Sequence, residues 1–95
     1  MIWSRFLAFL KRPREGQELP STGAVTDLDA ALETARSHTK ANGISWIPEY
    51  QAHRIFHRGR ACWIVTSNAR GIGHGVDVVI DDASGAVVGV NVRPR

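Results

Sequence analysis

The last part of the chain alternates between apolar and polar residues with the two-residue period of a β-strand. Residues 76–81 and 88–92 each carry valine or isoleucine at every second position. Asp, Ala, Ser and Gly85 separate the two runs, and glycine readily adopts the positive φ that tight turns require. The pattern therefore predicts a β-hairpin with one buried face. We expect the rest of the chain to cover that face.

Residues 26–43, TDLDAALETARSHTKANG, have the period of an amphipathic helix. Thr26 is placed to cap its first turn, and Gly43 to end it in the left-handed conformation. The apolar stripe follows the i, i+3, i+4, i+7 spacing and comprises Leu28, Ala31, Leu32 and Ala35. Because alanine is small, this stripe is nearly flat and suits close packing against a sheet.

Two further strands are predicted at residues 50–56 and 61–67, joined at residues 57–60. Trp46, in the connector before them, is expected to plug one end of the core. The order is then one helix followed by four antiparallel strands. This predicts an α+β, two-layer domain with the helix packed on a four-stranded sheet. One helix covers one side, so the second face is predicted to be open to solvent or to a partner.

The amino-terminal part is predicted to lie outside this domain. Residues 1–12 form a short amphipathic segment, residues 13–24 a linker rich in proline and glycine, and residues 25–95 the domain. The segment is too short to span a bilayer, and its bases follow the apolar run, whereas a signal peptide has them first. Three alternatives remain: a helix at a membrane surface, a helix docked on the domain or a partner, or a poorly ordered terminus. Peripheral membrane contact would use Trp3, Phe6, Leu7 and Leu10.

Length and charge limit the functional classes. Ninety-five residues allow one domain, and the single cysteine excludes an intrachain disulfide, which fits the cytoplasm, with or without membrane association. The net charge is +3, but residues 25–95 hold eight basic and seven acidic residues. This near-neutral part lacks the broad basic field of nucleic-acid binders. The exposed edges of the sheet allow a homodimer.

No pattern in the sequence predicts catalysis, a cofactor or a metal. The glycines of residues 71–75 precede a strand, whereas a phosphate-binding loop opens a helix. His53 and His57 would lie about 13 Å apart on one strand, too far to share a metal ion. Cys62, between Ala61 and Trp63, is typical of a small buried residue. We therefore expect a protein that is not an enzyme.

A basic cluster is the strongest candidate binding site. It lies on the hairpin and the loop after it, and comprises Arg54, His57, Arg58, Arg60, Arg70 and His74. Such bases could bind an acidic protein surface or a nucleic-acid backbone. The alternative is a solvated hairpin tip without a partner.

The strand around Trp63 and the hairpin pattern I-D-x-x-x-G-x-V, from Ile80 to Val87, resemble two families. These are the PepSY domain and the small bacterial immunity proteins with a nuclear-transport-factor-two-like fold, both cystatin-like modules. Trp63, Asp81, Gly85 and Val87 match as structural positions. The resemblance implies no catalytic residues. It implies a protein-binding and inhibitory function toward a partner protein whose identity the sequence leaves open.

Overall fold

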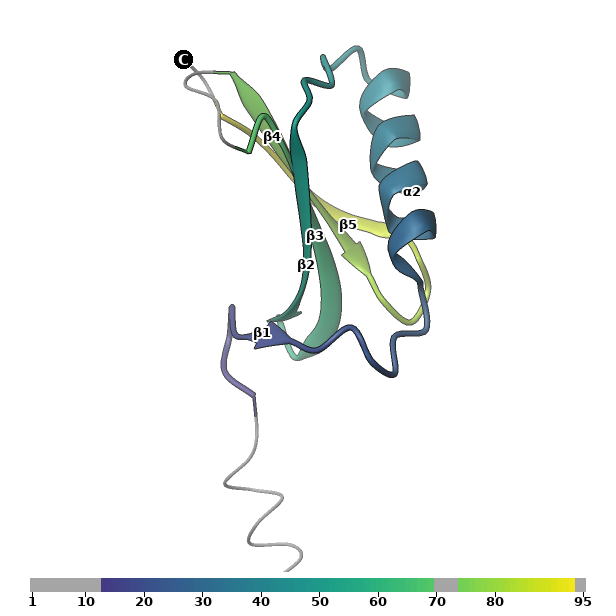
Figure 1. Cartoon of the computed structure of the whole chain (residues 1–95), viewed down its shortest axis with the longest axis vertical. Coiled ribbons are helices and arrows are strands. Elements are labelled where there is room, and N and C mark those ends of the chain that lie inside the picture. Colours follow the sequence, from purple (N-terminus) through teal and green to yellow (C-terminus); the bar gives the residue numbers. More distant parts are fainter. Residues whose placement is uncertain (1–12, 70–73, 94–95) are drawn as a thin grey trace, which may run out of the picture.

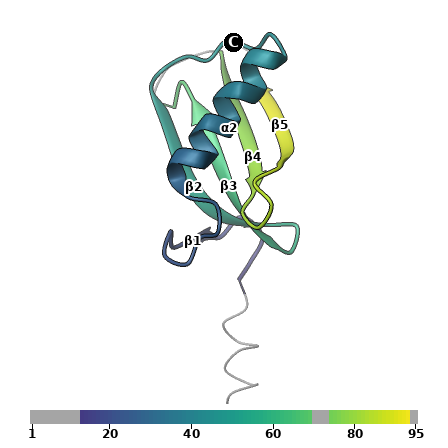
Figure 2. The same cartoon turned by 90° about the vertical axis from the view of Figure 1, so that its right-hand side faces the viewer.

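The computed structural model describes residues 13–69 and 74–93, which form one helix packed on one antiparallel sheet (Figures 1 and 2). The α+β class and the helix-on-sheet arrangement are confirmed, but the sheet has five strands where four were predicted. The strands lie side by side in chain order. The elements are β1 (Glu18–Leu19), α2 (Leu28–Ala41), β2 (Tyr50–His57), β3 (Arg60–Ser67), β4 (Gly75–Asp81) and β5 (Val87–Arg93).

The additional strand, β1, comes from the segment that the composition predicts as a linker. Leu19 pairs with Arg54 of β2, and Glu18 pairs with Ile55. Two backbone hydrogen bonds extend the contact, from Gly16 N to Phe56 O (2.7 Å) and from Phe56 N to Gln17 O (2.9 Å). A two-residue strand is too short to show a period in the sequence. Its position depends on the free edge of β2, which local patterns do not reveal.

The cap of the helix lies one residue later than predicted, at Asp27 and not at Thr26. The Asp27 carboxylate accepts the amide of Ala30 and caps α2, while the Thr26 hydroxyl donates to the carbonyl of Asp82 (2.6 Å). Gly43 has φ 67°, as the predicted left-handed stop requires. Of the predicted stripe, Ala31 and Ala35 are fully buried and pack on the sheet, and Leu32 is partly buried.

The prediction that Leu28 belongs to the buried stripe is wrong, because its side chain is 45% exposed. It lines a hollow of about 350 Å³ with Ala52 of β2 and Trp63 of β3. The helix packs mainly on β3, β4 and β5, and Ala52 is the residue of β2 that lines this hollow. Helical period alone does not show which turn of a helix extends beyond its support.

The core lies between α2 and the three last strands. The buried sheet residues are Trp63, Val65, Val76, Val78 and Ile80, which pack on Ala31 and Ala35. Trp46 packs at the border of this cluster, as expected, although it is only partly buried. Strand alternation then places Ile55, Cys62, Ile64 and Val79 on the other face of the sheet. Within residues 13–69 and 74–93 no helix or strand covers that face.

Both hairpins turn through residues with positive φ. Between β2 and β3, Arg58 and Gly59 have φ 50° and 81°, the two positive values of a type I′ turn. Between β4 and β5, Gly85 has φ 73° and its amide donates to the carbonyl of Asp81 (2.7 Å). The register shifts once, between Val79 and Ile80, at the start of β5.

Substitution by alanine should have different effects on stability at two glycines of this sheet. A β-carbon at Gly75 would overlap the Arg93 guanidinium and lie 2.9 Å from the Ser67 carbonyl oxygen, whereas at Gly89 the nearest atom is 3.7 Å away. We expect Gly75→Ala to lower the free energy of unfolding by about 1–3 kcal/mol through overpacking. Gly89→Ala should be neutral or slightly stabilising. Urea denaturation of both variants checks this, and an equal effect of the two would contradict the assigned packing.

Candidate functional site

The structure separates the basic cluster into parts, and Arg54 is not available for binding. Its guanidinium lies on the helix side of β2, where Nη2 is 3.1 Å from Oδ2 of Asp82. Nη1 donates to the carbonyls of Pro20 and Thr22. The two charged side chains are only 10% and 6% exposed. The prediction that Arg54 belongs to the binding surface is therefore not supported by its position, because an internal partner already holds it.

Asp82 joins the amino-terminal segment to the end of β4. Its carboxylate accepts the backbone amides of Val25 (3.1 Å) and Thr26 (3.0 Å) as well as the Arg54 guanidinium. Burial by itself would raise the pKa of Asp82, but the two amides and the Arg54 charge outweigh it and hold the pKa below its usual value. Local sequence patterns could not reveal these contacts, because the two amides lie more than fifty residues from Asp82 along the chain and Arg54 lies 28 residues from it.

Asp81, the neighbour of Asp82, does have the predicted local role. Its Oδ2 accepts the amide (3.1 Å) and the hydroxyl (2.8 Å) of Ser84 within the turn. Its other oxygen, Oδ1, lies 3.6 Å from Nη1 of Arg60. One carboxylate thus closes the turn and faces the neighbouring hairpin.

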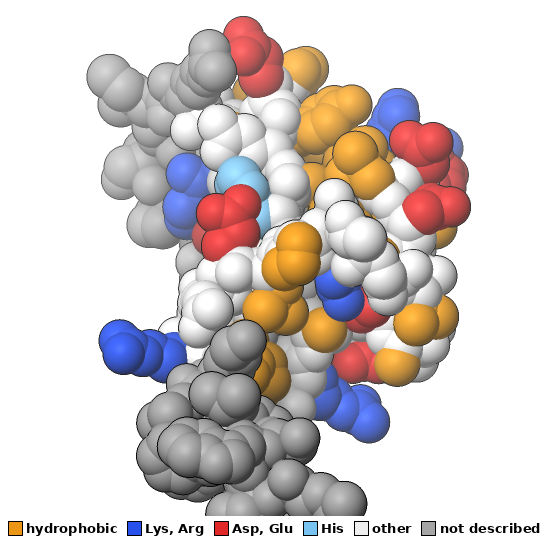
Figure 3. Space-filling model, turned by 60° about the horizontal axis from the view of Figure 1, so that its bottom comes forward, with side chains coloured by type: hydrophobic (Ala, Val, Ile, Leu, Met, Phe, Trp, Pro, Cys, Tyr) orange, Lys and Arg blue, Asp and Glu red, His pale blue; other side chains and the backbone are white. Residues whose placement is uncertain are grey.

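His57, Arg58 and Arg60 do lie together, at the end of the sheet that carries the β2–β3 turn. The carboxylate of Glu15 contacts two of these residues. One oxygen is 3.3 Å from Nδ1 of His57, and both oxygens accept the Arg58 backbone amide (2.8 and 3.0 Å). Arg60 faces Asp81, as described. Among the described residues, no carboxylate lies within ion-pair distance of the Arg58 side chain. This end therefore carries mixed charge, and Figure 3 shows both signs interspersed with apolar side chains.

A small hollow lies behind these bases. It measures about 150 Å³ and is lined by His57, Arg58, Arg60, Cys62, Asp81 and Val88. Cys62 is 2% exposed, and its burial together with the Asp81 charge raises the pKa of the thiol. A nucleophilic cysteine needs the opposite shift, toward the thiolate. The hollow is also smaller than the 300 Å³ or more typical of sites for small molecules.

The remaining members of the cluster lie elsewhere. His74 is exposed just before β4, beside the far end of β3, and its carbonyl accepts the Asn68 side-chain amide (2.7 Å). β3 has eight residues, so His74 lies about 20 Å from the β2–β3 turn. The sequence places these residues together because they are close along the chain, but a strand carries them to opposite ends. Arg70 lies outside the described residues, as do Trp3, Phe6, Leu7 and Leu10.

The open sheet face, defined by Ile55, Cys62, Ile64 and Val79, is the broader candidate surface. Apart from buried Cys62, these side chains are partly exposed. His53, beside Ile64, lies 3.6 Å from Glu18 of β1 through Nδ1. The face therefore has an apolar centre bordered by charged and polar groups of both signs. Interface cores in proteins combine these features.

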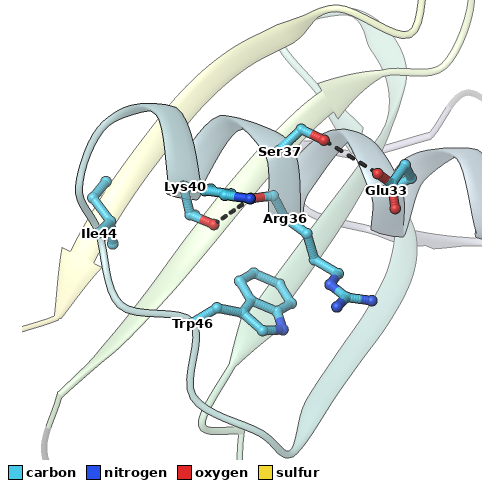
Figure 4. A pocket seen from close by; sticks show the side chains of 7 residues that line it. Glu33, Arg36, Ser37, Lys40, Ile44 and Trp46 are labelled. Atoms are coloured by element: carbon cyan, nitrogen blue, oxygen red, sulfur yellow. Dashed lines mark hydrogen bonds between the residues drawn. The ribbon is translucent and has the colours of Figure 1, made fainter.

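A third hollow, which the sequence did not predict, lies between α2 and the connector that follows it (Figure 4). It measures about 550 Å³ and is lined by Glu33, Arg36, Ser37, Thr39, Lys40, Ile44 and Trp46. Glu33 accepts the Ser37 hydroxyl (3.3 Å), one turn along the helix. Lys40 also stabilises the helix itself, because a basic side chain in the last turn interacts favourably with the helix dipole. That role accounts for Lys40 without a ligand.

Comparisons with protein-family models, with curated proteins and with solved structures give no match to this chain. Within residues 13–69 and 74–93, no group of three or more His, Cys, Asp or Glu side chains could hold a metal ion. In the same residues no helix is long and apolar enough to cross a membrane.

The Arg54–Asp82 pair should make a large contribution to stability. Asp82→Asn leaves the buried Arg54 without its counter-charge, and we expect the free energy of unfolding to fall by about 3 kcal/mol at neutral pH. Asp77→Asn is the matched control, because Asp77 and Arg93 form a pair at 3.6 Å that is 20% and 33% exposed. That change should cost about 1 kcal/mol or less. Urea denaturation measures both, and equal losses would contradict the assigned role.

The carboxylate of Asp82 should also make the free energy of unfolding depend on pH. Because the pKa of Asp82 is lowered in the folded state, its stabilisation is complete above the unfolded value of about 3.9 and is lost as pH falls through the folded value. The wild-type free energy of unfolding should therefore decrease below about pH 4 more steeply than that of Asp82→Asn. Denaturation midpoints measured from neutral pH down to about pH 2.5 test this. Parallel curves for the two proteins would show that Asp82 is not the group responsible.

Proposed function

We propose that this chain is a non-enzymatic protein-binding module that presents its open sheet face to a partner protein. The observation that carries the proposal is the one-sided packing of the sheet. The helix buries one face, while Ile55, Ile64 and Val79 remain partly exposed on the other. A solvated sheet face usually carries polar residues at the alternating positions. Three branched apolar side chains there are better explained by a partner surface.

The charges around the face favour a protein partner over a polyanion. A nucleic-acid backbone calls for unpaired cations, but Arg54 is buried, and Arg60 and His57 each face a carboxylate. Only the Arg58 side chain extends from the turn without an acidic neighbour among the described residues. A protein surface with an apolar patch and charges of both signs complements this arrangement.

The proposal includes inhibition of the partner, as the resemblance to immunity proteins and PepSY domains implies. Cys62 supports the non-enzymatic part, because its raised pKa keeps the thiol protonated at neutral pH. The alternative, a membrane-peripheral accessory domain, would be anchored by residues 1–14, and no feature of the described residues favours it.

Capture from lysate of the organism that encodes the chain tests the proposal. The full chain serves as bait in three forms: wild type, Ile64→Lys at the centre of the open face, and Leu28→Lys in the first turn of α2, where the leucine is 45% exposed. We expect one stoichiometric protein on the wild type and on Leu28→Lys, and about tenfold less on Ile64→Lys. Quantitative mass spectrometry provides the readout, and circular dichroism confirms that the variants fold.

Two outcomes would contradict the proposed surface. A partner retained equally by Ile64→Lys would place binding elsewhere on the molecule, and a partner lost from both variants would indicate general disruption. Purified partner then allows titration of its own activity with the chain. A partner that keeps full activity when saturated would remove inhibition from the proposal and leave binding intact.

A further inference from the structure

The two edges of the sheet differ. At the β2 edge, β1 and the residues before it pair with the backbone from Arg54 to Phe56. At the other edge, β5 pairs with β4 on one side, and no described element pairs with its outer side. An unpaired edge offers a row of backbone donors and acceptors to another strand.

The β5 edge is also apolar and lacks the usual protection. Val88, Val90 and Val92 are 49%, 39% and 44% exposed. Natural edges are guarded by lysine, proline, short length or a bulge, but residues 87–92 contain no charge and no proline. The single irregularity lies at the start of the strand and leaves residues 89–93 regularly paired with β4.

Arg93, the one charged residue of β5, does not guard the edge. Its Nε lies 3.6 Å from Oδ1 of Asp77 on the neighbouring strand, and its guanidinium donates to the Ser67 carbonyl on β3. The side chain is thus directed inward across the sheet. It leaves the valine positions free.

We propose that a second copy of this chain occupies the β5 edge, with the two β5 strands paired antiparallel about their middle. A two-fold axis makes such a contact self-complementary. Val90 and Val92 pair with Val78 and Val76 and therefore lie on the helix side of the sheet. Pairing centred near Val90 sets Val90 of one copy opposite Val90 of the other, within contact distance for cross-strand pairs. It also places the two Arg93 residues at opposite ends of the contact, so no like charges meet.

The expected dimer is weak, because a contact along one strand of seven residues buries less than the 1,000 Å² or so of stable interfaces. The sheet would continue through both copies. Their open faces would then lie side by side and form one larger surface. The inference goes beyond the proposed function and does not depend on it, since the edge and the face use different side chains.

Charge substitution at one position tests the pairing. In Val90→Lys or Val90→Glu, the two-fold axis brings like charges together, so each variant alone should be monomeric. An equimolar mixture of the two should regain the dimer, because opposite charges then face each other. Sedimentation velocity of the full chain over about 5–500 µM measures the states, with a wild-type dimer expected in the micromolar range. Val25→Lys, at a valine 73% exposed away from the edge, should dimerise as the wild type does.

Each outcome decides the proposal. Recovery of a dimer in the mixture supports it, and it also shows that the single variants are folded. A wild type that stays monomeric up to the highest concentration overturns it. So does a dimer that survives Val90→Lys, or a mixture that stays monomeric while the wild type dimerises. None of these results bears on capture through Ile64, so failure here is distinguishable from failure of the proposed function.

Discussion

The buried ion pair between Arg54 and Asp82 is the contact on which the arrangement of the chain depends. Two charges removed from water are costly unless every remaining donor and acceptor is satisfied nearby. Here Asp82 accepts the amides of Val25 and Thr26, and Nη1 of Arg54 donates to the carbonyls of Pro20 and Thr22, although the buried Nε of Arg54 has no hydrogen-bond partner. The pair thus fixes the segment before the helix, the second strand and the turn after β4 in one place.

The size of the helix explains why such a pair is needed. A helix is about 10 Å wide and covers only two or three strands at their spacing of about 4.8 Å. α2 covers β3, β4 and β5, so the helix side of β2 requires another cover. Residues 19–24 provide it, with Ala24 packed at the border of the core. Because this segment has no regular structure beyond β1, its backbone polar groups need partners, and Arg54 and Asp82 supply them.

Local pattern predicted the helix, the two hairpins and the closing glycines, because each depends on residues close together in sequence. It missed β1, whose two residues pair with a strand 35 or more positions away. The structure divides the predicted basic cluster for a related reason. Alternation placed Arg54 on one face of β2 and His57 on the other, but it could not show that the Arg54 side faces a carboxylate from the far end of the chain. Proximity in sequence also grouped His74 with a turn that the length of β3 keeps distant. The open face, by contrast, could be predicted, because the sequence contains one helix of the domain and one helix can cover only one face of the sheet.

The charged side chains of the sheet are largely paired within the chain, and this distinguishes them from the exposed apolar positions. Glu15 and Glu18, both from the amino-terminal segment, face His57 and His53 at one edge. Arg93 and Asp77 face each other across the last two strands. Most cations of the described sheet are therefore matched within the chain, which leaves the apolar positions as the parts without a partner. These positions fall in two places, the open face and the β5 edge. Because one continuous sheet carries both, a contact at the edge would enlarge the face without altering its chemistry.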